Sequence, residues 1–341
     1  MIARRDRISA DTLKTVAVLG AGAWGTALAL AFERVGAEVR LWTWRSAHAD
    51  AMAAEGQNGE HLSGVAFPER VRATASMEEA LDGAGLILLA TPSDAAITVA
   101  EAAARVGKTG APIVICSKGL GDRGALLSEC IGLVWQGPVL VLSGPSFADE
   151  VADQLPTILT LAGPAPLAAR LADYYSNGDF VLCPSNDVAG VQVAAVFKNV
   201  AAILCGVCDG VGLGANARAA LMSEAMREAA GVVRAMGGSV DTLLGPAGFG
   251  DFALTCTDVK SRNYSFGRRL GQGLATVTPG QTIEGAANVA SLVRLTRRLG
   301  VDAPLAAAVN GLLVGRCRPR EAVEAAFAWR RDRAFEAVRA A

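Results

Sequence analysis

A single lysine, Lys198, interrupts the long apolar run Val188–Cys208, which reads VAGVQVAAVFKNVAAILCGVC. The chain contains five lysines against 27 arginines, so a lysine at this place is unusual for this sequence. Burying an ammonium group without a partner is costly. Lysine also acts as a general acid or base once its site tunes a pKa of about 10.4. Taken alone, Lys198 can be a lysine that snorkels to water, but its position also makes it a candidate proton donor.

An acidic residue in the same half of the chain is a candidate partner for Lys198. In Gly245–Thr257 (GPAGFGDFALTCT), Asp251 opens a predicted helix after three glycines, and Thr255 lies one turn further on the same face. Alone, Asp251 fits a helix N-cap. Close to Lys198, its carboxylate would keep the ammonium charged, which suits donation of a proton.

The polar triplet Ser261-Arg262-Asn263 follows ten residues after Asp251. An arginine holds a phosphate through two parallel hydrogen bonds, and serine and asparagine can add further ones. Alone, the triplet is a polar loop. Together with Lys198 and Asp251 it predicts the polar floor of a cleft.

The first half carries a pattern typical of dinucleotide binding. A predicted strand (Val16–Leu19) meets Gly20-x-Gly22-x-x-Gly25, and a predicted helix (Thr26–Val35) and second strand (Glu38–Trp42) follow. The first glycine makes the tight turn, the second lets the backbone approach a pyrophosphate, and the third packs helix against strand. The helix N-terminus then faces the anion. In this strand–helix–strand context the motif is a strong indication of a nucleotide cofactor.

The end of the second strand bears on the choice of cofactor. A site selective for NAD usually has Asp or Glu there to bind the ribose 2′-hydroxyl, but this chain reads Thr43-Trp44-Arg45. Arg45 could bind a 2′-phosphate or be a solvated surface arginine. We therefore expect NAD or NADP as cofactor, with a preference for NADP. The only histidines, His48 and His61, also follow this strand, which leaves lysine as the available acid–base group on the substrate side.

The remaining pattern predicts an α/β protein. Further strands are expected at Leu86–Ala90, Ile113–Cys116, Val139–Leu142 and Ile158–Leu161. Lys118 follows one of them, at the sheet edge where ligands bind, although it can also be a surface lysine of a loop. We expect a Rossmann-type doubly wound sheet domain (residues 1–186) followed by an all-α helical domain (187–341) that binds substrate. The helical runs of the second domain are expected at Ala217–Met236, Thr282–Leu299 and Pro319–Arg339.

Composition limits the classes of partner. The net charge is −1, and charged residues make up 19% of the chain, so we expect no nucleic acid. The run Val188–Cys208 is about long enough to span a bilayer, but its three polar residues favour a buried helix, and we expect no membrane span. Seven scattered cysteines indicate a reducing, cytoplasmic compartment. Cys205 and Cys208 form a lone C-x-x-C, which we interpret as two buried residues, and no metal site is expected.

Several longer stretches resemble one known family over nearly the whole chain, the bacterial NAD(P)-dependent sn-glycerol-3-phosphate dehydrogenases. The matching stretches run in order: GAGAWGTALA (Gly20–Ala29), CSKGL (Cys116–Leu120), SGPSFADE (Ser143–Glu150), VFKNVAAI (Val196–Ile203), DGVGLGANARAAL (Asp209–Leu221), GFGDFALTCT (Gly248–Thr257), SRNYSFG (Ser261–Gly267) and IEG (Ile283–Gly285).

The resemblance implies reversible hydride transfer between NAD(P)H and dihydroxyacetone phosphate, giving sn-glycerol 3-phosphate for glycerophospholipid synthesis in a homodimer. It implies Lys198 as the catalytic residue. The implied substrate contacts are Lys118, Gly144, Ser146, Lys198, Asp251, Ser261, Arg262 and Asn263. The implied cofactor contacts are Gly20, Gly22, Ala23, Trp24, Gly25, Trp44, Arg45, Lys118, Ala148, Arg262, Thr282 and Glu284.

Small departures from the family pattern concern the cofactor. Ala23 stands where a serine is frequent, and Trp44 stands where a basic residue is frequent, which leaves Arg45 as the basic candidate. Phe249 stands where Leu or Met is frequent. Two rival functions stay open at this point. One is a related two-domain reductase of a β-hydroxyacid or ketopantoate, which needs no phosphate-binding triplet. The other is a nucleotide-binding sensor without turnover.

Overall fold

The computed structural model describes residues 12–106, 110–274 and 282–328. The chain divides into two compact units. The first comprises residues 1–117, 127–142 and 146–188, and the second comprises 118–126, 143–145 and 189–341. Two short loops that the sequence pattern places in the first half, 118–126 and 143–145, therefore belong to the second unit. One of them carries Lys118 and the other carries Gly144.

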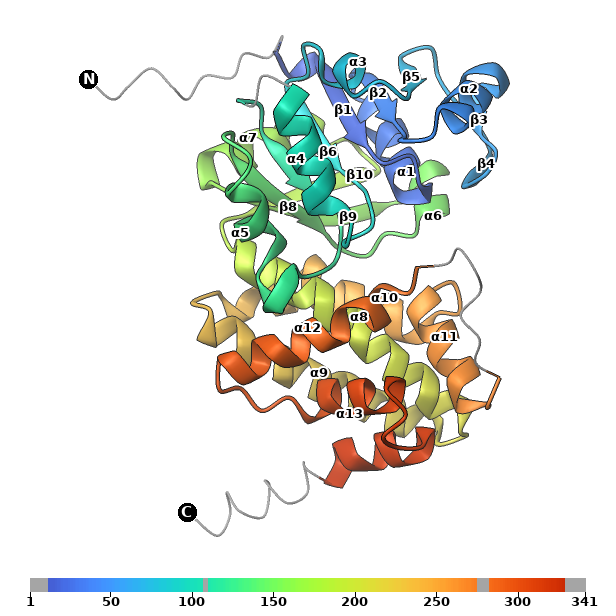
Figure 1. Cartoon of the computed structure of the whole chain (residues 1–341), viewed down its shortest axis with the longest axis vertical. Coiled ribbons are helices and arrows are strands. Elements are labelled where there is room, and N and C mark those ends of the chain that lie inside the picture. The colour runs from blue at the N-terminus through green and yellow to red at the C-terminus, as the bar shows by residue number, and fades with distance from the viewer. Residues whose placement is uncertain (1–11, 107–109, 275–281, 329–341) are drawn as a thin grey trace, which may run out of the picture. The chain divides into compact units, whose positions relative to one another are not determined.

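The first unit is built on an eight-stranded sheet, with strand order β10-β9-β8-β7-β6-β1-β2-β5 (Figure 1). The strands are β1 (Thr15–Leu19), β2 (Glu38–Trp42), β5 (Val71–Thr74), β6 (Leu86–Leu89), β7 (Ile113–Ile115), β8 (Val139–Ser143), β9 (Thr157–Ala162) and β10 (Phe180–Ser185). Strand β1 pairs in parallel with β2 and with β6, so Val18 faces Leu41 on one side and Leu88 on the other. The strand order reverses at β1, and ligands of such sheets bind at the carboxyl ends of the strands beside this point.

Helices cover the sheet, and a small hairpin lies beside it. The helices are α1 (Ala23–Glu33), α2 (Ser46–Glu55), α3 (Met77–Leu81), α4 (Ala96–Val106), α5 (Leu127–Gly132), α6 (Ala148–Ala152) and α7 (Ala165–Tyr175). The hairpin pairs β3 (Gln57–Asn58) with β4 (Leu62–Ala66) in antiparallel fashion. The Tyr175 hydroxyl donates a hydrogen bond to the Leu13 carbonyl at 2.6 Å, which ties α7 to the start of the chain.

The six strands expected from the sequence are present, and the doubly wound sheet is confirmed. The strands that the pattern missed include β5 and β10, which are the two edges of the sheet. Edge strands are less buried and tolerate polar residues and proline. Strand β5 reads VRAT and β10 reads FVLCPS, with exposed or half-exposed positions between buried ones. Their hydrophobic signal is therefore weak.

The second unit is helical in its described residues (Figure 1). Its α-helices are α8 (Val188–Gly210), α9 (Gly214–Ala235), α10 (Asp251–Thr257), α11 (Arg262–Gly271), α12 (Glu284–Arg298) and α13 (Pro304–Leu313). Residues 319–328 are also helical, and the rest of the expected helix Pro319–Arg339 lies outside the described residues. Helix α8 is long and apolar enough to cross a membrane, but its most apolar window is 100% buried, as in the core helix of a folded unit.

Helices α8 and α11 touch through their backbones. A Cβ atom added to Gly267 would lie 2.0 Å from the Ile203 carbonyl oxygen, and one added to Gly206 would lie 2.1 Å from the Tyr264 carbonyl oxygen. Both distances are far shorter than any real Cβ contact, so no larger residue fits at either glycine without moving a helix. The glycines therefore set the close approach of the two helices.

Candidate active site

The glycine loop between β1 and α1 has the geometry that its motif predicts. Gly20 has φ +120° and donates its N–H to the Trp42 carbonyl at 3.0 Å. A Cβ atom on Gly20 would lie 2.7 Å from the Ala90 carbonyl oxygen, and one on Gly25 would lie 1.8 Å from the Gly20 carbonyl oxygen. By contrast, a Cβ atom on Gly22 would meet nothing within 4 Å. The loop is thus packed tightly on one side and open at its middle glycine.

The open side of this loop fits a dinucleotide. Helix α1 begins at Ala23, and its N-cap residue, Gly22, makes no side-chain capping bond. The first N–H groups of the helix therefore remain as donors for an anion. Among the described residues, the buried Nε1 atom of Trp24 and the buried Oγ1 atom of Thr91 have no hydrogen-bond partner. Thr91 follows β6, next to the Ala90 that Gly20 touches, so orphaned polar atoms lie where a polar ligand is expected.

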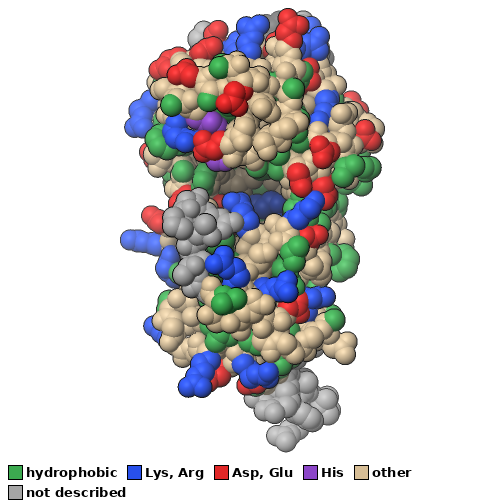
Figure 2. All heavy atoms as spheres, turned by 90° about the vertical axis from the view of Figure 1, so that its right-hand side faces the viewer, with side chains coloured by type: hydrophobic (Ala, Val, Ile, Leu, Met, Phe, Trp, Pro, Cys, Tyr) green, Lys and Arg blue, Asp and Glu red, His purple; other side chains and the backbone are tan. Residues whose placement is uncertain are grey.

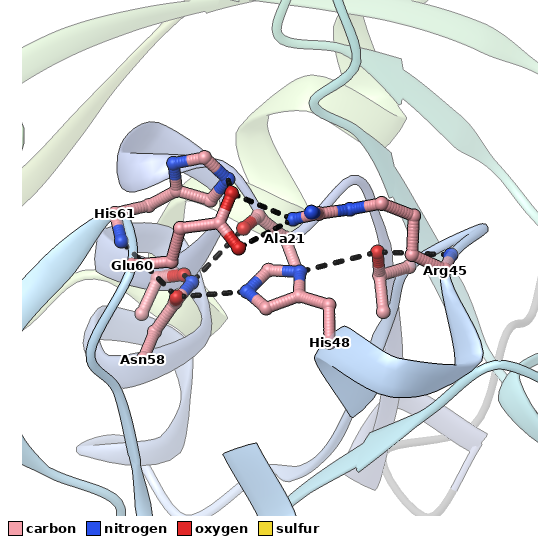
Figure 3. Close-up of polar contacts among 8 residues, drawn as sticks. Ala21, Arg45, His48, Asn58, Glu60 and His61 are labelled. Carbon is pink, nitrogen blue, oxygen red and sulfur yellow. Dashed lines mark hydrogen bonds and ion pairs between the residues drawn. The ribbon is translucent and has the colours of Figure 1, made fainter. Parts of the chain in front are cut away.

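An acidic side chain from a later segment of the chain lies close to Arg45, which follows the end of β2. Trp44 is 77% exposed. The neighbouring Arg45 places its Nη2 atom 2.7 Å from each carboxylate oxygen of Glu60, fifteen residues further along the chain (Figure 3). The hydrogen bond from Arg45 is the main cause that lowers the pKa of Glu60. The basic residue assigned to a 2′-phosphate is therefore already paired with a carboxylate.

The two histidines lie together beside this pair, with ring centroids 5.2 Å apart (Figure 3). His48 is buried, and its Nε2 atom lies 3.0 Å from the Oδ1 atom of Asn58. Asn58, which is 0% exposed, donates from Nδ2 to the Ala21 carbonyl at 2.9 Å and to the Thr26 hydroxyl at 2.8 Å. Asn58 thus ties the hairpin to the glycine loop.

The side chains of His48, Glu60 and His61 place possible metal-ligand atoms within 4.8 Å of one another. Each of these side chains already lies close to a protein partner. The Nδ1 atom of His48 is 3.3 Å from the Thr43 hydroxyl, and the Nε2 atom of His61 is 3.4 Å from a carboxylate oxygen of Glu60. Burial lowers the pKa of His61, although the nearby Glu60 carboxylate opposes this shift. The expectation of no metal site stays a prediction.

The helical unit contains a buried cluster of two lysines around one carboxylate. The Nζ atom of Lys198 lies 2.6 Å from Oδ1 of Asp251, and the Nζ atom of Lys118 lies 2.9 Å from Oδ2 of the same residue. Lys198 also donates to the Thr255 hydroxyl at 2.8 Å. Lys118 approaches the Gly144 carbonyl at 3.4 Å. Five residues named in the sequence analysis therefore meet in one place: Lys118, Gly144, Lys198, Asp251 and Thr255.

Burial dominates the electrostatics of Lys198. Its side chain is only 6% exposed. Loss of solvation lowers its pKa, Asp251 raises it, and the second positive charge of Lys118 lowers it again, which leaves the pKa at about 7. The sequence led us to expect that Asp251 would keep Lys198 charged. That expectation is incomplete, because it ignored the desolvation of the ammonium and the presence of Lys118.

Asp251 serves as the shared acceptor of both lysines. Burial raises its pKa, but the two neighbouring ammonium groups outweigh burial, and the net effect is a lowered pKa. The alternative reading of Asp251 as an N-cap does not describe its position, because Gly250 occupies the N-cap and Asp251 is the first residue of α10. Its carboxylate is held by lysines at both oxygens.

The Ser261-Arg262-Asn263 triplet forms the start of α11. Ser261 is its N-cap and accepts a hydrogen bond from the Tyr264 N–H. Asn263 donates to Oδ1 of Asn199 at 3.0 Å and accepts from the Gly285 N–H at 2.8 Å. These two side chains therefore help to fix the helix N-terminus, and their expected role as phosphate donors stays a prediction. Arg262 is exposed and makes no ion pair with any described residue.

The other predicted contact residues are distributed over both units. Ser146 and Ala148 belong to the first unit, where Ala148 begins α6. Thr282 is half-buried, and Glu284 begins α12. The carboxylate of Glu284 accepts a hydrogen bond from Asn288 at 3.2 Å.

Sequence reasoning missed Asn58, Glu60 and Asn199 as supporting residues. Asn199 was visible beside Lys198, but its partner Asn263 is 64 residues away, so the bond could not be read from local spacing. Glu60 and Asn58 lie in a short polar hairpin that has no periodic signal. Their proximity to the motif depends on the return of the chain after α2.

Comparison with known proteins agrees with this geometry. Residues 15–168 match the family model described as the NAD-dependent glycerol-3-phosphate dehydrogenase N-terminus, and residues 187–324 match the model for its C-terminus. A glycerol-3-phosphate dehydrogenase (NAD(P)+) of Halorhodospira halophila is 43% identical over 311 residues, covering 88% of this chain and 92% of the relative. One of Rhodospirillum rubrum is 40% identical over 319 residues, covering 91% and 90%.

Solved structures give the same result. The crystal structure of glycerol-3-phosphate dehydrogenase from Coxiella burnetii matches with a TM-score of 0.87 and 38% identity, over 92% of this chain and 98% of that one. A ketopantoate reductase from Ralstonia eutropha matches with a TM-score of 0.60 at 20% identity. This second likeness shows a shared fold only.

Proposed function

The chain belongs to the NAD-dependent glycerol-3-phosphate dehydrogenase family, and from this premise we propose that it interconverts dihydroxyacetone phosphate and sn-glycerol 3-phosphate with NAD or NADP as cofactor. The observation that carries the proposal is the buried cluster of Lys118, Asp251 and Lys198 in the helical unit. It supplies a lysine with a pKa of about 7, close to the working pH that suits a general acid or base.

When bound, NAD(P)H supplies the hydride that reduces the substrate carbonyl carbon. Lys198 gives the proton that the carbonyl oxygen needs to become a hydroxyl, and it takes that proton back in the oxidation direction. Asp251 and Thr255 hold the Nζ atom of Lys198 in place. Lys118 adds a second positive charge, which stabilises negative charge that develops on the same oxygen.

Arg262 is the residue to which we assign the substrate phosphate. Its side chain is exposed at the first position of α11, where the helix dipole also favours an anion. Ser261 and Asn263 fix this helix end, and we assign them as further substrate contacts beside Arg262 on the resemblance. Phosphate binding then orients the carbonyl for reaction, since binding energy from a remote group can be used for positioning.

The cofactor is assigned to the first unit on the fit of the glycine loop. Gly20, Gly22 and Gly25, with Ala23 and Trp24, would hold the pyrophosphate. Trp44 and Arg45 would contact the adenosine end. The roles of Ala148, Thr282 and Glu284 rest on the resemblance alone, whereas a preference for NADP rests on Arg45 and on the missing acid at the end of the second strand.

We further propose that the protein is a cytoplasmic homodimer that feeds glycerophospholipid synthesis. None of the seven cysteines forms a disulfide bond in the structure, which is compatible with a reducing compartment. The dimer rests on the family resemblance, and light scattering coupled to size-exclusion chromatography tests it directly.

The decisive experiment mixes purified protein with dihydroxyacetone phosphate and follows the absorbance of NADH and NADPH in parallel. We expect rapid oxidation of at least one cofactor. We expect little turnover of unphosphorylated dihydroxyacetone, because Arg262 then has no phosphate to bind.

Two results would overturn the assignment. Turnover of ketopantoate or a β-keto acid at a rate equal to or above that of dihydroxyacetone phosphate would favour the related reductases. Tight binding of cofactor without turnover of any ketose phosphate would favour a sensor.

A further inference from the structure

The pair formed by Arg45 and Glu60 is placed where a dinucleotide-binding sheet reads the ribose of its cofactor. Arg45 follows β2, whose last residue, Trp42, accepts the hydrogen bond from Gly20 in the glycine loop. Glu60 follows Asn58, which is bonded to the Ala21 carbonyl of the same loop. Both charged residues are therefore held beside the motif, from two different segments of the first unit.

Both charges remain within reach of a ligand. The side chain of Arg45 is 36% exposed and that of Glu60 is 49% exposed. The pair borders a cavity of about 310 Å³, which is also lined by Met52 and Glu55. Figure 2 shows a few histidine atoms reaching the surface beside basic and acidic side chains. An exposed ion pair of this kind contributes little to stability, so an anion can compete with the carboxylate for Arg45.

Arg45 and Glu60 have opposite preferences for the two cofactors: the carboxylate favours NAD, and the guanidinium favours NADP. A carboxylate accepts a hydrogen bond from a free ribose 2′-hydroxyl, as the acid at the end of the second strand does in NAD-selective sheets. A guanidinium binds a 2′-phosphate in a bidentate manner, but here one of its nitrogens, Nη2, already lies 2.7 Å from both carboxylate oxygens of Glu60. A 2′-phosphate must therefore compete with Glu60 for the Nη2 atom of Arg45 and tolerate the negative charge of Glu60 nearby.

We propose that Glu60 is a specificity-determining residue, which favours NAD by accepting the ribose 2′-hydroxyl and opposes NADP by competing with the 2′-phosphate for Arg45. The proposal rests on the proposed use of NAD(P) and corrects the preference for NADP inferred from Arg45 alone. The acid that is missing from the end of β2 is thus supplied by Glu60, which lies in the hairpin fifteen residues after Arg45.

The test measures binding of two adenosine ligands that differ only in the 2′-phosphate. Titration calorimetry with 2′,5′-ADP and with 5′-AMP compares the wild type with Glu60→Gln. We expect the variant to raise the affinity for 2′,5′-ADP relative to 5′-AMP by about fivefold or more, since it frees the guanidinium. Arg45→Gln should shift the ratio in the opposite direction, and Glu60→Gln should have little effect when Arg45 is already replaced.

A matched control is available in the same unit. Glu38 and Arg70 form another exposed pair at 3.7 Å, with side chains 55% and 54% exposed. Glu38→Gln removes the same charge away from Arg45 and should leave the ratio unchanged.

Two outcomes overturn the proposal. In one, Glu60→Gln leaves the ligand ratio within about twofold of wild type. In the other, it shifts the ratio equally with and without Arg45. Neither ligand carries nicotinamide or substrate, so an error in the assigned reaction would not change these results. Steady-state rates with NADH and NADPH provide a second readout, and the ratio of their kcat/KM values should move in the same direction.

Discussion

Each unit holds a carboxylate against cationic side chains, and the two arrangements differ most in their burial. In the first unit, Glu60 and Arg45 lie 2.7 Å apart with side chains 49% and 36% exposed. In the helical unit, Asp251 lies between Lys118 and Lys198, and its side chain is 1% exposed.

Water screens the exposed pair, so its charges stay fixed while its partners can be exchanged. Burial acts differently in the helical unit. It makes the charge of Lys198 itself variable, because desolvation brings its pKa to about 7. The first arrangement suits selection of a ligand, and the second suits transfer of a proton.

The largest expected effect comes from removing the titrating lysine. Lys198→Met should lower kcat by about 10²–10⁴-fold, since a positioned proton donor contributes that much. Lys198→Arg keeps the positive charge without a pKa near neutrality and should also be slow. Circular dichroism and thermal unfolding check that both variants fold. Turnover of Lys198→Met within about tenfold of wild type would remove the proposed role.

Glu228 shows how burial changes the pKa of a carboxylate whose hydrogen-bond partners are backbone N–H groups and not lysines. This carboxylate is 0% exposed and accepts the N–H groups of Leu305 and Ala306, at the start of α13. Burial raises its pKa to about 7, although the two N–H bonds oppose the shift. Its folded pKa therefore lies above its unfolded value, so the stabilisation is complete below about pH 4.5 and is lost as the pH rises through about 7.

We expect this residue to lower the free energy of unfolding by about 3 kcal/mol between pH 5 and pH 8. Glu228→Gln keeps an acceptor oxygen and should abolish that slope, measured by denaturant unfolding at several pH values. The exposed Glu324 offers a control variant, Glu324→Gln, which should follow the wild type. A slope that persists in Glu228→Gln would show that burial of this carboxylate is not its origin.

The pH dependence of catalysis reports on the buried cluster directly. Reduction needs protonated Lys198, so kcat/KM for dihydroxyacetone phosphate should fall by up to about tenfold per pH unit above about pH 7. Oxidation needs the neutral amine and should fall on the acid side of the same pKa. Initial rates in both directions across the pH range measure the two limbs. If neither limb bends near pH 7 in the wild type, Lys198 does not titrate in the rate-determining proton transfer.

The smallest expected effect comes from Asn58, which ties the hairpin that carries Glu60 to the glycine loop. Asn58→Ala removes the bonds to the Ala21 carbonyl and the Thr26 hydroxyl and leaves both buried groups without this partner. We expect about tenfold weaker binding of NAD and of NADP, since an unsatisfied buried group costs about 1–3 kcal/mol. The ratio of the two dissociation constants should stay unchanged, in contrast to Glu60→Gln. A selective loss of one cofactor would mean that Asn58 also reads the ribose.

The local sequence pattern was enough to predict the central strands, because a strand buried on both faces appears as a continuous apolar run. It was also enough for Lys198, whose charge contrasts with an apolar helix. The same reasoning could not find Glu60 as the partner of Arg45. The sequence of a short polar hairpin does not indicate which distant residue its side chains will contact in the folded chain. Nor could it find the pKa of Lys198, which depends on the depth of burial and on Lys118 from a loop 80 residues earlier in the chain.

The backbone contact between α8 and α11 has a consequence for the size of the substrate. The 64-residue offset of the Asn199–Asn263 bond recurs where Gly267 meets Ile203, so the two helices run side by side in constant register. Lys198 and Arg262 directly precede the two asparagines, one on each helix. The spacing between the two helix backbones is set by glycines that pack directly against carbonyl groups of the other helix. Repacking of side chains therefore cannot change this spacing. Discrimination among phosphorylated ketones by chain length would then be a property of the scaffold itself.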